Sequence, residues 1–204
     1  MAFSLILASS SPYRRALLQQ LRLPFGHAAP HIDEEAKPGE SANSLALRLA
    51  EEKALALAPI NPQSLIIGSD QVAECDGRIL GKPGGREQAI AQLSACSGSR
   101  VTFYTGLSVF NSATRRQISS VETYTVHFRQ LNAGQIERYV ELEKPYDCAG
   151  SFKVEGLGIT LFEKLEGSDI NTLVGLPLIR LVDFLGEFGV SPLAPVAKGS
   201  GAAS

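Results

Sequence analysis

The sequence predicts an α/β fold with a mixed β-sheet, and three observations support this prediction. Apolar runs of strand length alternate with amphipathic segments of helix length. The continuous apolar run 65–72 is typical of a buried central strand. Two longer segments, 100–110 and 118–129, have strand composition and a short polar connection, which indicates an antiparallel hairpin. We therefore expect parallel and antiparallel strands in one sheet that is flanked by helices.

Caps, turn residues and apolar spacing place the other elements. Ser11 and Pro12 suit the start of a helix, and Asp76-Gly77 is typical of a tight hairpin turn. We expect helices over 12–22, 41–57, 86–95, 132–143 and 177–188, and further extended segments over 5–8, 24–29, 78–80 and 159–165. Because Gly68-Ser69 is a typical backbone break, the central strand is expected to end close to Asp70.

Length and composition limit the possible classes of protein. The chain has 204 residues, of which 44% are hydrophobic and 20% charged, so it can form a full core. We expect one domain over 1–190, with two lobes around a central cleft, and a disordered tail over 191–204, which is rich in Ala, Gly, Ser and Pro.

Charge and hydropathy exclude several partners. The net charge of −2 and the lack of a Lys/Arg run argue against nucleic acid as a partner. No apolar stretch reaches the roughly 18 to 20 residues that span a bilayer, and the start of the chain does not resemble a secretory signal. The three cysteines form no Cys-x-x-Cys pair, and His127 lies in an alternating strand pattern. We therefore expect a cytoplasmic protein without zinc or histidine chemistry.

The first turn of the chain is a candidate anion site. An apolar strand runs into Ser9-Ser10-Ser11-Pro12-Tyr13-Arg14-Arg15, which opens a helix. Serine hydroxyls, backbone N–H groups at a helix N-terminus and guanidinium groups all bind phosphate well. The alternative is ordinary helix capping, with the arginines as surface charges. The pattern suggests a phosphorylated small molecule as the ligand.

Isolated acids and a lysine complete the candidate site. Asp70 follows apolar and small residues, and it could hold a divalent ion or accept a proton from water. Lys82 stands in a glycine-rich turn, and Glu34 stands in an acidic loop. Each could instead be an ordinary turn or surface residue. The phosphate-loop motif is absent because Gly81-Lys82 is followed by Pro83. Together these residues indicate metal-assisted attack on a phosphoanhydride.

Several of these motifs, in this order, resemble the Maf family of nucleotide pyrophosphatases over roughly residues 5–190. The resemblance implies an elongated fold like that of the inosine triphosphate pyrophosphatases. It also implies a divalent cation (Mg²⁺ or Mn²⁺), cleavage of a nucleoside triphosphate to monophosphate and pyrophosphate, and a homodimer. The motifs are Leu7-Ala8-Ser9 with Ser11-Pro12 and Arg14-Arg15, Asp33-Glu34, Gly68-Ser69-Asp70-Gln71, Gly81-Lys82-Pro83, Tyr104-Thr105-Gly106, Phe128-Arg129, Ala149-Gly150-Ser151 and Val174-Gly175-Leu176-Pro177.

The resemblance assigns roles to individual residues. Asp70 matches the proposed general base for attack of water on the α-phosphorus, and Glu34 and Asp70 are the expected metal ligands. The residues expected around the triphosphate are Ser9, Ser11, Arg14, Lys53 and Lys82.

Tyr13, Gln71 and Glu155 stand where branches of the family differ, and they resemble the branch that acts on 7-methyl-GTP. Methylation at N7 gives the base a positive charge. A cation–π interaction with an aromatic ring such as Tyr13 stabilises this charge by about 0.5 to 2 kcal/mol. Tyrosine stands here where tryptophan is typical of that branch. Glu155 could accept both N1–H and the amino group of guanine, a pair worth about 1 to 3 kcal/mol.

Other readings stay open from the sequence. The enzyme could act on dTTP and UTP, or on inosine or xanthosine triphosphate. It could also be a nucleotide-binding regulator of septum formation in which hydrolysis is incidental.

Overall fold

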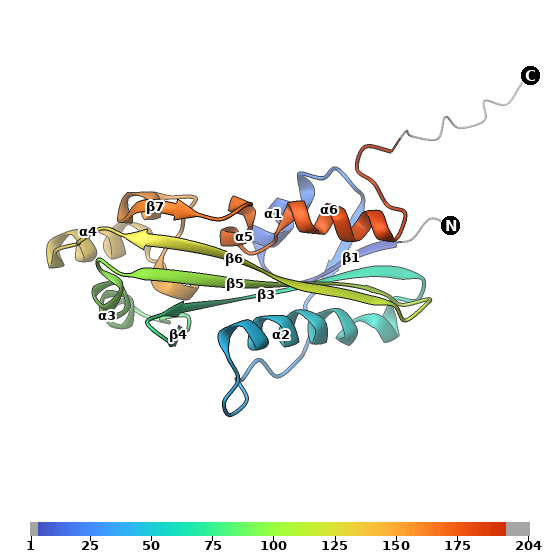
Figure 1. The fold of residues 1–204 in the computed structure, drawn as a ribbon, viewed down its shortest axis with the longest axis horizontal. Coiled ribbons are helices and arrows are strands. Elements are labelled where there is room, and N and C mark those ends of the chain that lie inside the picture. The colour runs from blue at the N-terminus through green and yellow to red at the C-terminus, as the bar shows by residue number, and fades with distance from the viewer. Residues whose placement is uncertain (1–3, 195–204) are drawn as a thin grey trace, which may run out of the picture.

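The computed structural model describes residues 4–194 and contains one sheet of seven strands (Figure 1). The strands follow the order β2-β1-β3-β5-β6-β7, and β4 pairs with β3. β3, β5 and β6 have 12 residues each, roughly 40 Å of strand, which gives the molecule its elongated shape. The strands are β1 (Ser4–Ala8), β2 (Phe25–Ala28), β3 (Ser64–Cys75), β4 (Arg78–Leu80), β5 (Arg100–Asn111), β6 (Gln117–Phe128) and β7 (Phe162–Glu166).

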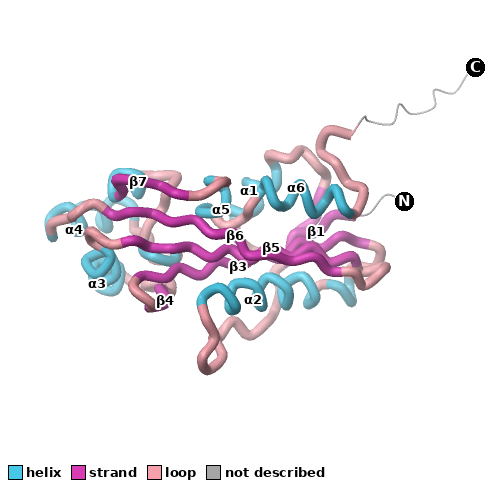
Figure 2. The backbone as a smooth tube through the Cα atoms, in the orientation of Figure 1, coloured by secondary structure: helices cyan, strands magenta, loops and turns pink. Residues whose placement is uncertain are grey.

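The helices cover both faces of this sheet (Figures 1 and 2). α2 lies along one face, and α1, α5 and α6 lie on the other. α3 and α4 lie at the far end of the sheet, away from β1. The helices are α1 (Pro12–Gln19), α2 (Ala42–Ala56), α3 (Arg86–Cys96), α4 (Ala133–Glu143), α5 (Ile170–Val174) and α6 (Leu178–Glu187). Short 3-10 helices occur at Ala58–Ile60, Ala149–Ser151 and Leu157–Leu161.

The predicted fold class is confirmed. β1 pairs in parallel with β2 and β3, whereas β3, β5, β6 and β7 pair antiparallel in succession. The helix starts follow from side-chain caps, because Ser11, Ser41 and Asn132 each accept a backbone N–H of the first turn.

Three details differ from the prediction. β3 does not end near Asp70 but continues to Cys75, so Gly68-Ser69 is not a break. α1 ends at Gln19 because the N–H groups of residues 20–22 bond three residues back and tighten the last turn. The strand expected over 159–165 begins only at Phe162, because Leu157–Leu161 forms a 3-10 helix.

Gly68 and Gly106 let α2 lie directly on the sheet. A Cβ atom on Gly68 would lie 2.0 Å from the carbonyl oxygen of Ala50, and one on Gly106 would lie 2.0 Å from that of Ala46. A side chain at either position would therefore push the helix away from the strands. The alanines of α2 complete this close contact, so the glycine in mid-strand marks a close approach of two backbones.

Successive residues of β3 face opposite sides of the sheet. Leu65 and Ile67 pack in a cluster with residues of α1 and α6, whereas Ile66 packs against Ala54 of α2. Continued along the strand, this alternation turns Asp70 toward α2 and Gln71 toward α5.

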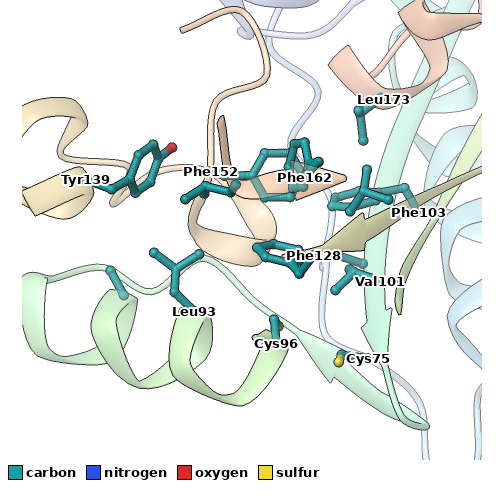
Figure 3. Packing of buried hydrophobic residues seen from close by; sticks show 14 of the residues in the cluster. Cys75, Leu93, Cys96, Val101, Phe103, Phe128, Tyr139, Phe152, Phe162 and Leu173 are labelled. Carbon is teal, nitrogen blue, oxygen red and sulfur yellow. The ribbon is translucent and has the colours of Figure 1, made fainter. Parts of the chain in front are cut away.

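The far end of the sheet has its own core, in which aromatic rings meet edge to face (Figure 3). The ring centroids of Phe152 and Phe162 lie 4.7 Å apart, and those of Phe103 and Phe152 lie 5.3 Å apart. Cys75 and Cys96 are buried in the same cluster as free thiols. Phe152 thus anchors the irregular segment between α4 and β7.

The expected disordered tail lies mostly outside the described residues. Ala194 still donates its N–H to the carbonyl of Ser191, and residues 195–204 are not described. Within residues 4–194, no helix is long and apolar enough to cross a membrane.

Candidate active site

A gap in the sheet defines the site. β1 pairs with β3 as far as Gly68, and β4 pairs with β3 only from Ala73 onward. Between these points neither β1 nor β4 pairs with the edge of β3 at residues 69–72. A cleft of about 690 Å³ opens here, lined by the segments that follow β1 and β4, among others.

The structure brings all the predicted site residues together in this one cleft. They come from segments that are far apart in the chain, and their individual roles stay predictions. The residues are Ser9, Ser11, Tyr13, Arg14, Glu34, Lys53, Asp70, Gln71, Lys82 and Glu155.

Lys53 lies between two carboxylates at the centre of the cleft. Its Nζ is 2.5 Å from Oδ1 of Asp70 and 2.7 Å from Oε1 of Glu34. Lys53 and Asp70 are buried, with 6% and 8% of their surface exposed, whereas Glu34 is exposed. Burial raises the pKa of Glu34, but its hydrogen bond from Lys53 and the charges of Lys53, Lys82 and Arg14 lower it below the ordinary value overall. The carboxylate is therefore ionised at neutral pH.

The loop that carries Glu34 is fastened to α2 by Arg48. The guanidinium donates to both carboxylate oxygens of Glu40, at 2.7 and 2.9 Å, and to the backbone carbonyl of Glu35 at 2.9 Å. A bidentate pair of this kind fixes orientation as well as distance. Because Arg48 and Lys53 are on the same helix, one rigid element positions both Lys53 and the loop of Glu34.

The first turn of α1 is built as the sequence predicts. Oγ of Ser11 accepts the N–H of Arg14 at 3.3 Å, and Oγ of Ser9 accepts the N–H of Ser11 at 3.1 Å. Each serine acts as an acceptor in these bonds, so its hydroxyl proton can still be donated to a ligand.

A backbone carbonyl orients the side chain of Arg14. Its Nε donates to the oxygen of Gly175 at 2.8 Å, and the buried hydroxyl of Ser69 donates to the same oxygen at 2.9 Å. Burial lowers the pKa of Arg14, while the charges of Asp70 and Glu34 act in the opposite direction. Gly175 has a φ of 117°, a conformation that favours glycine.

Gln71 holds α5 in place on the other face of the sheet. Its Nε2 donates to the carbonyls of Thr172 at 2.8 Å and Leu173 at 3.1 Å, and to Oγ1 of Thr105 at 3.1 Å. Within the described residues its Oε1 has no hydrogen-bond partner, and no buried side-chain atom there lacks one, so this oxygen is accessible. Any contact of Gln71 with a ligand would therefore use Oε1.

Another part of the cleft lining is aromatic and acidic. Tyr13 is partly buried, and Phe103, Phe152 and the exposed Glu155 line the same space. Burial is the largest cause that raises the pKa of Tyr13, and nearby acidic groups, Asp147 and Glu155 among them, add to it. Sequence reasoning missed Asp147, which also lines the cleft; its only signal is its place before Cys148-Ala149-Gly150 in an irregular segment.

The two expected metal ligands fit a shared cation site. Glu34 and Asp70 converge on the ammonium of Lys53, so their oxygens already face one positive charge. Across residues 4–194, no cluster of three or more His, Cys, Asp or Glu side chains could hold a metal. Mg²⁺ is often held by one or two carboxylates together with substrate phosphates. These residues therefore fit a cation that arrives with a polyphosphate.

The fold and the cleft together define a class of α/β proteins in which a mixed sheet opens a charged cleft at a gap between its strands. Within this class, the chain belongs to the Maf family, because the family model for Maf-like proteins matches residues 4–188.

Curated relatives cover nearly the whole chain. A protein of Pseudomonas aeruginosa named 7-methyl-GTP pyrophosphatase is 61% identical over 186 residues, which are 91% of this chain and 97% of the relative. A Vibrio vulnificus protein of the same name is 55% identical over 191 residues, 94% of this chain and 98% of the relative. Among solved structures, a HAM1 protein from Coxiella burnetii matches with a TM-score of 0.50 and 14% identity, covering 91% of this chain and all of that chain. This likeness supports the fold alone.

Proposed function

We propose that the chain is a nucleoside triphosphate pyrophosphatase that hydrolyses 7-methyl-GTP to 7-methyl-GMP and pyrophosphate with Mg²⁺ or Mn²⁺. The observation that carries this proposal is the convergence of Glu34, Lys53 and Asp70 in a cleft between the segments that follow β1 and β4, which we expect to bind phosphate. The names of the relatives, at 55% to 61% identity, support the same reaction and the same substrate.

The triphosphate would lie across the gap in the sheet. Ser9, Ser11 and Arg14 follow β1 on one side, and Lys82 follows β4 on the other. Hydroxyl protons, backbone N–H groups and two cations are suited to phosphate oxygens. The arrangement would hold the α-phosphorus near Asp70 and thereby reduce the entropy cost of the reaction.

Asp70 would act as the general base. Its Oδ1 is paired with Lys53, whereas Oδ2 has no hydrogen-bond partner among the described residues and is not buried. Oδ2 would take a proton from water as the water oxygen bonds to the α-phosphorus and the bond from that phosphorus to the bridging oxygen breaks. Pyrophosphate leaves with the electron pair of that bond. Lys53 would stabilise the charge that develops.

A divalent cation would be held by Glu34 and Asp70 together with phosphate oxygens. When bound, it would neutralise negative charge on the phosphates and on the leaving pyrophosphate.

The base would be recognised at the aromatic part of the cleft lining. Tyr13 would stack on the methylated purine, and Glu155 would accept from N1–H and the amino group. Gln71 would contribute through its free Oε1.

We also propose a cytoplasmic homodimer that binds neither nucleic acid nor membrane. The exposed Ile179 and Val182 of α6 support a protein contact on that face, since 60% and 38% of their surfaces are exposed. Light scattering of the wild type and of Ile179→Asp tests this: the variant should lose the dimer and keep the fold.

Product analysis tests the proposed reaction. Purified protein with Mg²⁺ or Mn²⁺ should convert 7-methyl-GTP to 7-methyl-GMP and pyrophosphate, and heavy-oxygen-labelled water should label only the monophosphate. Asp70→Asn should reduce turnover by about 100- to 10,000-fold, whereas the exposed turn variant Asp76→Asn should retain it. Release of inorganic phosphate and 7-methyl-GDP would contradict the proposal.

A further inference from the structure

The charged residues that line the cleft fall into two groups. The first group contains three cations and two carboxylates, so its net charge is positive. Its members are Arg14, Lys53, Lys82, Glu34 and Asp70. The other charged lining residues are Asp147 and Glu155, both on the segment between α4 and β7. This second group contains two carboxylates and no cation.

Asp147 and Glu155 line the same cleft as Tyr13, and the neighbouring Cys148, Ala149 and Phe152 line it too. The negative charges of Asp70 and Glu34 raise the pKa of Arg14. The negative charges that raise the pKa of Tyr13 include those of Asp147 and Glu155. Asp147 and Glu155 therefore lie on the side of Tyr13, where the base would bind. Lys153 also acts on Tyr13, but its ammonium is directed to the backbone carbonyl of Glu143, at 3.2 Å, and is not part of the lining.

The segment that carries both acids is held firmly by the rest of the fold. The carbonyl of Tyr146 accepts the N–H of Gly84 at 2.9 Å, and the hydroxyl of Tyr139 accepts the N–H of Lys153 at 3.0 Å. Between these points, Phe152 is packed against Phe103 and Phe162 (Figure 3). Asp147 is exposed, and its Oδ1 accepts from the thiol of Cys148 at 3.5 Å. Its carboxylate is therefore presented to the cleft from a fixed backbone.

Guanine and 7-methylguanine differ by one methyl group and one delocalised positive charge. A contact from Glu155 to N1–H and the amino group is available with either base, so it separates guanine from pyrimidines and not GTP from 7-methyl-GTP. A carboxylate that does not pair with those donors would respond to the charge alone.

We propose that Asp147 is a specificity-determining residue that recognises the positive charge of the N7-methylated base. This inference rests on the proposed function. The lining of the cleft then offers cations to a negative triphosphate and the carboxylates of Asp147 and Glu155 to a positive base. Because Asp147 is exposed, its contribution should be about two- to fivefold, the range of a solvent-screened charge pair.

Three triphosphates separate charge from shape: 7-methyl-GTP, GTP, and 7-methyl-7-deaza-GTP, which keeps the methyl group and lacks the charge. Asp147→Asn should lower kcat/KM for 7-methyl-GTP about two- to fivefold and leave the two uncharged bases unchanged. The wild-type preference for the charged base should also decrease as salt is added. Glu155→Gln should lower kcat/KM for all three, and the exposed variant Glu163→Gln on β7 should change none. An equal loss for all three substrates in Asp147→Asn, or no loss at all, would overturn the proposal.

Binding of the same nucleotides, measured by calorimetry, keeps this test independent of turnover. If the wild type hydrolyses none of them but binds 7-methyl-GTP more tightly than the deaza analogue, and Asp147→Asn removes that difference, only the proposed function fails. If the wild type binds charged and uncharged bases equally, the proposal for Asp147 fails.

Discussion

The ammonium of Lys53 and the carboxylate of Asp70 are buried against each other, with 2.5 Å between Nζ and Oδ1. The contact joins a helix to a strand, and it exists because α2 crosses β3 at Gly68 and β5 at Gly106 without intervening side chains. Two glycines in mid-strand thus set the position of the charged residues in the cleft.

Removal of Lys53 should abolish this arrangement. In Lys53→Met, Glu34 would lose the hydrogen bond and the positive charge that lower its pKa, so it would bind a proton more readily. We expect kcat to fall by at least about 100-fold and the acidic limb of the pH–rate profile to move to higher pH. Steady-state kinetics across pH measure both, and an unchanged acidic limb would contradict this account.

Gly106→Ala should destabilise the fold by about 1 to 3 kcal/mol, because the added Cβ would meet the backbone of α2, which cannot move independently. Gly186→Ala in α6 is the matched control, since nothing lies within 4 Å of its Cβ position and alanine favours helix. Urea unfolding measures both. Equal stability of the two variants would show that α2 does not depend on this contact.

Ser69→Ala should impair binding more than catalysis. The hydroxyl donates to the carbonyls of Gly106 and Gly175, and the second of these also orients Arg14. Its loss should raise KM for the nucleotide several-fold and leave kcat within about twofold, because Arg14 would hold the phosphates less firmly. Ser119→Ala on β6, outside the cleft, is the control. A fall in kcat with unchanged KM would argue against this role of Gly175.

Glu40 should make stability depend on acid pH. Hydrogen bonds from Arg48 and from the backbone of Lys37 hold the pKa of Glu40 at about 2, compared with the ordinary 4.5. Since the folded state lowers this pKa, the contribution is complete above pH 4.5 and is lost as the pH falls toward about 2. Glu40→Gln should therefore lower Tm at neutral pH and flatten the decline of Tm in acid. Parallel curves for variant and wild type would refute this.

The features predictable from the sequence were local. Ser11, Ser41 and Asn132 cap helices through bonds to residues three positions away, so the residue type and its spacing were sufficient. The order of motifs likewise identified residues that meet in one cleft.

What the sequence could not provide depends on contacts between distant segments. The sequence predicts a break at Gly68 because nothing local reveals that Ala50 lies over it. The hydrogen bonds of Gln71 to α5, about one hundred residues away, cannot be predicted for the same reason. Asp147 has no local pattern of its own, and only its position beside Tyr13 makes it a candidate.

The most direct test of the central claim is kcat/KM of the purified protein for 7-methyl-GTP, GTP, UTP, dTTP, inosine triphosphate and xanthosine triphosphate, measured with Mg²⁺ and with Mn²⁺. We predict that 7-methyl-GTP exceeds every other nucleotide by about tenfold or more. A tenfold preference for dTTP or UTP would contradict the assignment of Tyr13 and Glu155 to the methylated purine, and absence of hydrolysis of all six would contradict the proposed activity itself.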